Sequence, residues 1–242
     1  MRHMLAAVSV VFIVLTWIFL VFARPTEWET VTGSAAGFTT LVGYFFGAAC
    51  LLVATLPGLP ARTTAVIPIA LVLNIVIGQI VGSVGIPLYL DSVGTVLVAA
   101  LAGPTAGVTT GVLSSVVWGL FNPAALPFAA VSGFVGASAG YVSKNGWFKR
   151  PVPVILSGVV VGIVSGLLAA PIAAFVYGGT AGVGTGALVA LFRAMGNSLL
   201  GSVTLQSVVS DPLDKALVFL LVYLVLKALP KKILASLTPK ER

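Results

Sequence analysis

The chain has 242 residues, of which 59% are hydrophobic and only 8% are charged. This composition provides too little polar surface to cover a water-soluble core, so it excludes a soluble domain and predicts an all-α integral membrane protein. The formal net charge of +7 comes from basic residues at the ends of apolar segments. Because no basic run is interleaved with aromatic residues, we expect no nucleic-acid partner.

Hydropathy predicts eight apolar spans in chain order. The first begins like a signal peptide, but its apolar run is long and Phe-Ala-Arg-Pro is a poor cleavage site, so we interpret it as a span. We divide the chain into an N-terminal two-helix membrane hairpin, residues 1–60, and a membrane core, residues 61–242. The predicted spans are 4–22, 37–56, 64–84, 88–102, 105–121, 124–142, 153–177 and 212–229.

The distribution of Lys and Arg predicts the orientation in the membrane. A cytoplasmic N-terminus places ten of the 13 basic residues inside and five of the six acidic residues outside, as the positive-inside rule requires. If the mostly apolar stretch 178–211 crossed the membrane, the basic C-terminal segment would lie outside. We therefore expect 178–211 to form an outer-face hairpin or lid, a re-entrant segment or an interfacial helix, and both termini to be cytoplasmic.

Two segments carry a small residue at every fourth position. Residues four apart lie on one face of a helix, and small side chains there let two helices approach closely. We therefore expect each stripe to be a helix–helix seam. The stripes are Gly103, Gly107, Gly111, Ser115 and Gly119, and Gly158, Gly162, Gly166, Ala170 and Ala174.

The sequence contains no constellation typical of an enzyme. A single histidine, His3, and a single cysteine, Cys50, leave no metal set and no internal disulfide. There is no Walker A sequence, no Gly-x-Ser-x-Gly and no His-Glu-x-x-His. We expect no enzymatic activity, no cofactor and no bound metal, and the chain cannot hydrolyse ATP by itself.

Polar side chains within the apolar spans are the candidates for ligand contacts, because burying them in lipid is costly. Asn74 and Gln79, on the third span, fit either a ligand contact or a bond between helices. Asp91 fits three roles, which are a ligand contact, a helix cap and an ion pair with Lys215. Asp211 fits an N-cap in Ser-Asp-Pro, or an ion pair with Lys215 one turn later.

Further candidates belong to the vestibule that we expect on the outer face. Tyr89 and Trp118 could stack on a planar ring, although anchoring at the membrane interface is the alternative for both. A vestibule of amides, carboxylates and aromatic rings suits a small polar ligand with a planar ring. The remaining candidates are Asn122, Arg193, Asn197 and Gln206.

Several motifs occur in a characteristic order. An Asn-containing span, 65–74, precedes Pro-Leu-Tyr-Leu-Asp-Ser-Val-Gly-Thr at 87–95 and Ala-Gly-Pro-Thr-Ala-Gly at 102–107. Asp-Pro-Leu-Asp-Lys at 211–215 and Leu-Pro-Lys-Lys at 229–232 follow. Over about 62–232 this order resembles the substrate-binding S components of energy-coupling factor (ECF) importers, a type of ABC transporter.

The resemblance implies a six-helix core from 64 to 229, a solute site on the outer side and a prokaryotic plasma membrane. It implies three partners, which are a transmembrane coupling subunit and two cytoplasmic ATPases. Ala61 and Ala65 have the Ala-x-x-x-Ala spacing that such proteins use for docking. The chain lacks the N-terminal histidine motif of the metal-transporting branch, so the implied solute is an organic heterocycle, nucleoside- or vitamin-like.

Two other functions are compatible with the residues. One is a membrane sensor or assembly module that binds a ligand without transporting it, for which the N-terminal hairpin is the main support. The other is a proton-coupled carrier. It requires a titratable group at mid-membrane, and Asp91, the one candidate, is expected near the outer end of its span.

Overall fold

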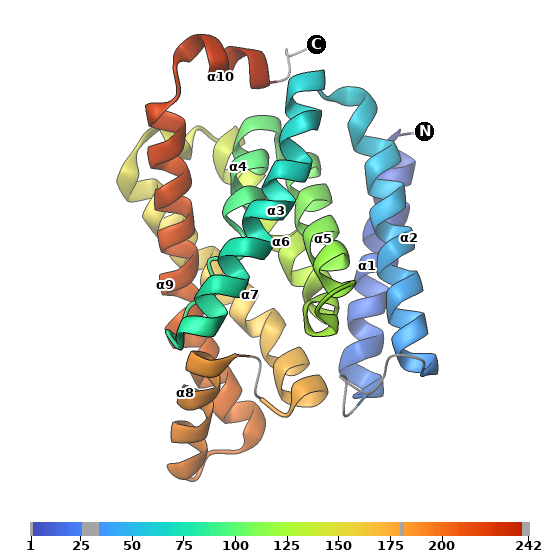
Figure 1. Ribbon diagram of the computed structural model, residues 1–242, viewed down its shortest axis with the longest axis vertical. Helices are drawn as coiled ribbons and strands as arrows, with labels where there is room; N and C mark the ends of the chain where they lie inside the picture. Colours follow the sequence, from blue (N-terminus) through green and yellow to red (C-terminus); the bar gives the residue numbers. More distant parts are fainter. Residues whose placement is uncertain (1, 26–33, 180–181, 239–242) are drawn as a thin grey trace.

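The computed structural model describes residues 2–25, 34–179 and 182–238, and within them the chain is helical with no strand. Figure 1 shows an elongated bundle in which most helices run along the long axis. The helices are α1 (Arg2–Ala23), α2 (Ala35–Thr55), α3 (Ala61–Val84), α4 (Val93–Ala102), α5 (Pro104–Gly119), α6 (Ala129–Lys144), α7 (Pro151–Tyr177), α8 (Val183–Ala194), α9 (Leu199–Ala228) and α10 (Lys231–Leu237), with short 3-10 turns η2 (Leu56–Gly58), η3 (Pro123–Phe128) and η4 (Trp147–Lys149).

Five helical segments among the described residues are long and apolar enough to cross a membrane, which makes the chain an all-α membrane protein. Large apolar side chains on the outward face of α3, such as Ile69, Val72, Val76 and Ile80, are exposed, as expected of a surface that contacts lipid. The five segments are Met4–Ala23, Ala35–Gly58, Ala61–Val84, Pro123–Lys144 and Pro151–Tyr177.

The two ends of the bundle differ in charge. The start of α1, the end of α9 and α10 lie at one end, and α8 lies at the other with the ends of α3 and α7 (Figure 1). We call these the basic end and the α8 end. The basic residues of the helix termini and turns at the basic end are Arg2, Arg62, Lys144, Lys149, Arg150, Lys227, Lys231 and Lys232.

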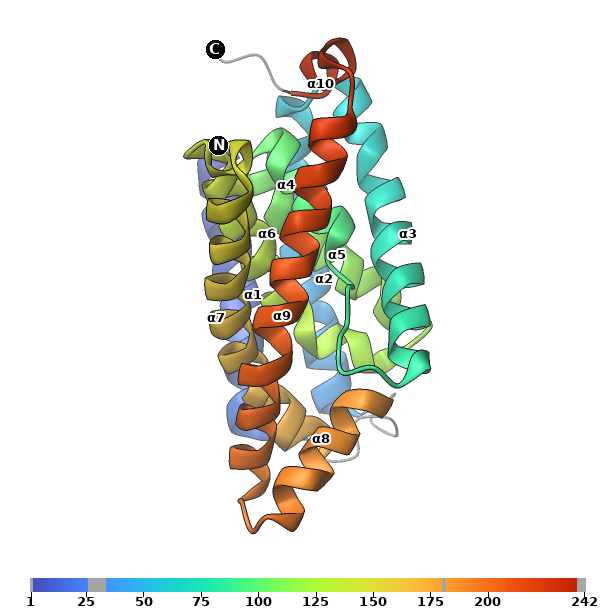
Figure 2. The ribbon, with the colours of Figure 1, turned by 90° about the vertical axis from the view of Figure 1, so that its left-hand side faces the viewer.

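The predicted span 88–102 is wrong in its first part. The helix in this region, α4, begins only at Val93 and has ten residues. Residues 85–92, which we call the inner loop, return from the α8 end towards the middle of the bundle, where α4 starts (Figure 2). Gly85 ends α3 with a φ of 80°, and Leu90 has a φ of 49°, so the backbone of this apolar stretch is not helical.

The segment after α7 also differs in part from the expectation. As expected, α8 lies at one end of the bundle and does not cross it (Figure 2). However, residues 199–211 belong to α9, which continues past Pro212 to Ala228. The N-cap is Ser198, whose Oγ accepts a hydrogen bond from the Gly201 amide at 3.1 Å. A helix start at Ser210-Asp211 is therefore a wrong prediction.

Both small-residue stripes are confirmed as helix–helix seams. A Cβ placed on Gly158 of α7 would lie 2.7 Å from the Ala216 Cα of α9, and one on Gly162 would collide with the Asp211 carbonyl. In the other seam, a Cβ on Gly111 of α5 would collide with the Ser132 carbonyl of α6. These backbones approach as closely as glycine allows, and this fixes α9 against α7.

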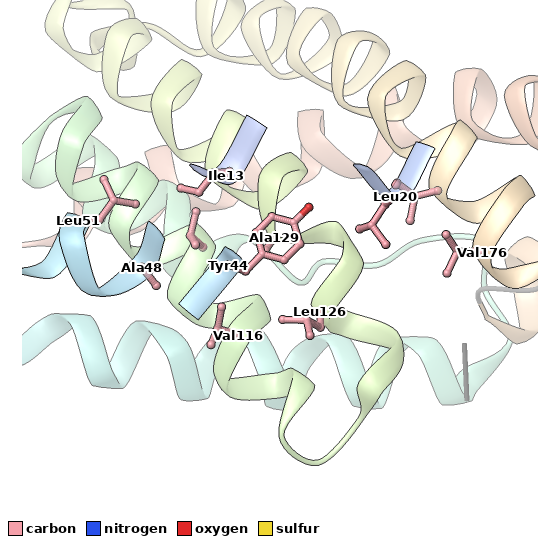
Figure 3. Close-up of a cluster of buried hydrophobic side chains, with 11 residues drawn as sticks. Ile13, Leu20, Tyr44, Ala48, Leu51, Val116, Leu126, Ala129 and Val176 are labelled. Atoms are coloured by element: carbon pink, nitrogen blue, oxygen red, sulfur yellow. The ribbon is translucent and has the colours of Figure 1, made fainter. Parts of the chain in front are cut away.

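The N-terminal hairpin packs against α5, η3, α6 and α7 (Figure 3). Polar bonds join it to the core at three levels. Tyr44 Oη donates to the Pro127 carbonyl at 3.3 Å, Trp17 Nε1 donates to the Leu168 carbonyl at 3.2 Å, and the Thr55 and Thr109 hydroxyls are 2.9 Å apart. Side chains in this interface include Ile13, Leu20, Tyr44, Ala48, Leu51, Val116, Leu126, Ala129 and Val176.

Candidate functional site

Four charged residues meet where the inner loop contacts α9. We call Asp91, Asp211, Asp214 and Lys215 the charge cluster. Lys215 Nζ lies 2.6 Å from Asp214 Oδ2 and 3.3 Å from Asp91 Oδ1. The ion pair between Asp91 and Lys215 is therefore confirmed, whereas the alternative pair between Asp211 and Lys215 is absent from the described residues.

Asp214 anchors the inner loop. Its Oδ1 accepts hydrogen bonds from the backbone amides of Tyr89 at 2.9 Å and Leu90 at 2.7 Å. The side chain is completely buried, and its other oxygen contacts Lys215. Bonds to an ionised acceptor in a dry site are strong, so this carboxylate holds the loop in place. Sequence reasoning missed Asp214, although its position within Asp-Pro-Leu-Asp-Lys was the available signal.

Asp211 is buried, and no Lys or Arg of the described residues lies within 4 Å of its carboxylate, although Lys215 acts on it at longer range. Its exposed fraction is 6%, and its side chain lies over Gly166 of α7, where an added Cβ would be 3.2 Å from Asp211 Cγ. Ser207, one turn earlier, is its hydrogen-bond partner. The cluster thus combines three carboxyl groups with one ammonium group. An excess of buried carboxylate is costly unless a further positive group or proton arrives.

A line of buried polar atoms without hydrogen-bond partners runs along α9 next to the charge cluster. Three of these atoms are Ser202 Oγ, Gln206 Nε2 and Ser210 Oγ, and their residues are spaced by four, so they lie close to one helix face. Ser92 Oγ, beside Asp91 in the chain, is unpartnered as well. Buried polar atoms almost always bond to protein, water or ligand. Within the described part of the chain, these four are the buried side-chain atoms without a hydrogen-bond partner.

Two aromatic side chains border this region. Tyr89 of the inner loop lies with its side chain beside those of Gln206 of α9 and Thr185 of α8. Trp118 of α5 and Asp91 meet over Gly78 of α3, because a Cβ there would lie 2.7 Å from Trp118 Cη2 and 2.9 Å from Asp91 Cβ. The absent side chain of Gly78 therefore makes room for both. Sequence reasoning did not single out Gly78, since it belongs to neither stripe.

Asn74 is completely buried and bonds the start of α4 to α3 and α5. Its Oδ1 accepts from the Gly94 amide at 2.7 Å and from the Thr95 amide at 3.4 Å. Its Nδ2 donates to Thr95 Oγ1 at 2.8 Å and to Ser114 Oγ at 3.1 Å. These bonds use both donors and both lone pairs of the amide, as expected for the interhelical role that the sequence left open.

The other predicted site residues lie outside this constellation. Gln79 is exposed on α3, and Arg193 is exposed at the end of α8. Asn122 caps η3 by accepting from the Ala124 amide at 3.2 Å, and Asn197 Nδ2 donates to the Phe192 carbonyl at 3.0 Å. The structure thus brings together five predicted residues, Tyr89, Asp91, Trp118, Gln206 and Asp211, around the inner loop and α9.

Comparison with protein-family models, curated proteins and solved structures returned no match for this chain.

Proposed function

We propose that this protein is the membrane-embedded solute-capture subunit of an ECF-type importer. The observation that carries the proposal is the set of buried, unpartnered polar atoms beside the charge cluster, under the inner loop. A membrane protein that leaves such atoms unsatisfied in its interior is suited to bind a small polar solute there. On this view Tyr89 and Trp118 stack on a ring, and Asp91, Gln206 and Ser210 bind its polar groups.

Two further observations support the proposal. The segments that carry the resemblance to S components, 87–95 and 211–215, contact each other through Asp214 and Lys215 although about 124 residues separate them. On the proposal, the expected six-helix core corresponds to α3, α4, α5, α6, α7 and α9 in chain order, with the inner loop as the return between the first two. The N-terminal hairpin is an addition to this core.

The proposed orientation puts the basic end in the cytoplasm and the α8 end outside, following the positive-inside rule. The solute then enters from the α8 end. Because the chain has no nucleotide-binding motif, a transmembrane coupling subunit and two cytoplasmic ATPases supply the energy. Ala61 and Ala65 are exposed near the basic end of α3, as a docking patch requires. The hairpin packs on α5, α6 and α7 and leaves this patch accessible.

Co-expression with a coupling subunit and ATPases tests the proposal. We expect these subunits to co-purify with the chain and solute uptake to depend on all of them. Ala65→Trp should abolish co-purification and uptake but preserve solute binding, because the patch lies far from the charge cluster along α3. Ile69→Trp, on the lipid-exposed face, is the control. Solute binding without uptake and without ATPase partners would instead favour a ligand-binding sensor or assembly module.

A further inference from the structure

We propose that the solute of this site is a small planar organic cation and that Asp211 is its counter-ion. The inference rests on the proposed function and specifies its solute class. It follows from the pairing of the charged groups, from the unpartnered hydroxyls beside them and from the two aromatic side chains.

One ammonium group, that of Lys215, serves three carboxyl groups, so the charge cluster has an excess of negative charge. Lys215 Nζ contacts Asp214 and Asp91, at 2.6 and 3.3 Å. No Lys or Arg of the described residues lies within 4 Å of Asp211, which is nevertheless 6% exposed. A solute cation would compensate this buried charge. An anionic solute would add repulsion from three carboxylates, and with a neutral solute the excess charge would have to be compensated by a proton.

Two unpartnered hydroxyls neighbour these carboxylates. Ser210 lies one turn before Asp214 on the same face of α9 and is 1% exposed, and Ser92 follows Asp91 in the chain and is 4% exposed. A hydroxyl oxygen accepts hydrogen bonds from the N–H groups of an organic cation. These two residues therefore provide the neutral acceptors that a bound cation needs beside its counter-ion.

The aromatic residues favour a planar and delocalised cation. Trp118 meets Asp91 over Gly78, and Tyr89 contacts Gln206 one turn away from Ser210. The face of an aromatic ring attracts cations and stacks on flat groups. Amidinium-like groups and protonated nitrogen heterocycles combine a positive charge, flat N–H donors and a stackable face. They form the solute class that these residues fit.

A charge series of equal shape tests the inference. Benzamidine, benzamide and benzoate are flat and nearly isosteric, and at pH 7 they carry charges of +1, 0 and −1. Equilibrium dialysis of each against the detergent-purified full chain at low salt gives three dissociation constants. We expect benzamidinium to bind about tenfold more tightly than benzamide, and benzoate to bind most weakly, because one desolvated ion pair readily provides that ratio.

Two variants test whether Asp211 causes the preference for benzamidinium over benzamide. Asp211→Asn should reduce the ratio between benzamidinium and benzamide to about one, because it removes the counter-ion without changing the shape. Ser207→Ala removes the hydrogen-bond partner of Asp211 without changing its charge, so it should retain the preference. Size-exclusion elution and circular dichroism establish that each variant is folded.

Three outcomes would overturn the inference. They are equal affinities for benzamide and benzamidinium, no binding of benzamidinium, and a preference that persists in Asp211→Asn. The measurement on the unmodified chain decides the first two, even if the variant fails to fold. Failure of this inference is distinguishable from failure of the proposed function. ATPase-dependent uptake of a neutral solute would contradict the cationic solute class, but it would still support the role as an importer subunit.

Discussion

The Asp214 carboxylate of α9 lies 2.7 Å from the backbone nitrogen of Leu90 and holds the inner loop at a point where the backbone is left-handed. Since the other carboxylate oxygen contacts Lys215, a single buried side chain connects the shape of the loop to the charge cluster. Asp91 differs from Asp214, because a third of its side chain is exposed. We therefore assign Asp214 to the scaffold and Asp91 to the solute.

Asp214→Ala should destabilise the protein strongly. The change leaves two buried amides and the Lys215 ammonium without their acceptor, and breaking a buried ion pair costs about 3 kcal/mol or more. Unfolding of the purified chain in detergent measures the loss. Asp91→Asn is the control, with an expected loss of about 1 kcal/mol or less, because that pair is longer and partly exposed. Equal stabilities for Asp214→Ala and the unmodified chain would disprove the anchoring role.

Asp91→Asn should weaken solute binding without reducing membrane expression, and Asn197→Ala, which lies outside the site, is the control. Asp91 borders the unpartnered Ser92, whereas Asn197 bonds the Phe192 carbonyl at the turn between α8 and α9. We expect a loss of affinity of about tenfold for Asp91→Asn and an unchanged affinity for Asn197→Ala. A binding assay and the membrane yield of each variant measure the two effects. A fall in the yield of Asp91→Asn that parallels its loss of binding would show that Asp91 is structural.

Gly78→Ala should weaken solute binding, whereas Gly82→Ala should not. A methyl group on Gly78 would meet the Trp118 ring at 2.7 Å and Asp91 Cβ at 2.9 Å, so these side chains must move apart. Gly82, one turn along α3, has no atom within 4 Å of an added Cβ. Replacing it removes a helix-interior glycine and should stabilise α3 by about 0.5 kcal/mol. Equal solute affinities for the two variants would contradict the proposed place of Trp118 and Asp91.

Ser210→Ala should stabilise the empty protein and weaken solute binding. The Ser210 hydroxyl is buried without a partner, and an unmade buried hydrogen bond costs about 1–3 kcal/mol. Removing the hydroxyl relieves that cost in the empty state and removes a solute contact. Thermal unfolding and binding should therefore change in opposite directions. The half-buried Thr204, which already bonds the Leu200 carbonyl, gives the matched control Thr204→Ala. Loss of stability in Ser210→Ala would exclude the solute role.

The sequence predicts the helical class, most helix positions and both glycine seams, because apolar runs and four-residue spacings are local patterns. It does not predict the inner loop. Leu88 and Leu90 continue the apolar pattern of a span. Leu90, whose φ is left-handed, donates its backbone amide to Asp214, which lies 124 residues away in the chain. Pro212 resembles a helix start but lies inside α9.

The sequence predicts which residue types form the candidate site better than it predicts which of their side chains contact each other. The opposite charges of Asp91 and Lys215 suggest an ion pair, and the structure confirms this alternative. The choice between Asp211 and Asp214 as the second partner depends on side-chain direction, since both lie within one turn of Lys215. Gly78 could not be identified, because its role is the space that it leaves for Trp118.

Mass spectrometry of small molecules released from the detergent-purified chain tests the central claim most directly, with Asp91→Ala as the comparison. The account predicts one organic compound at near-stoichiometric amount in the unmodified chain and its loss from the folded variant. If the unmodified chain is folded and releases nothing beyond what Asp91→Ala releases, and the same holds after incubation with extract of its own cells, the site does not capture a solute.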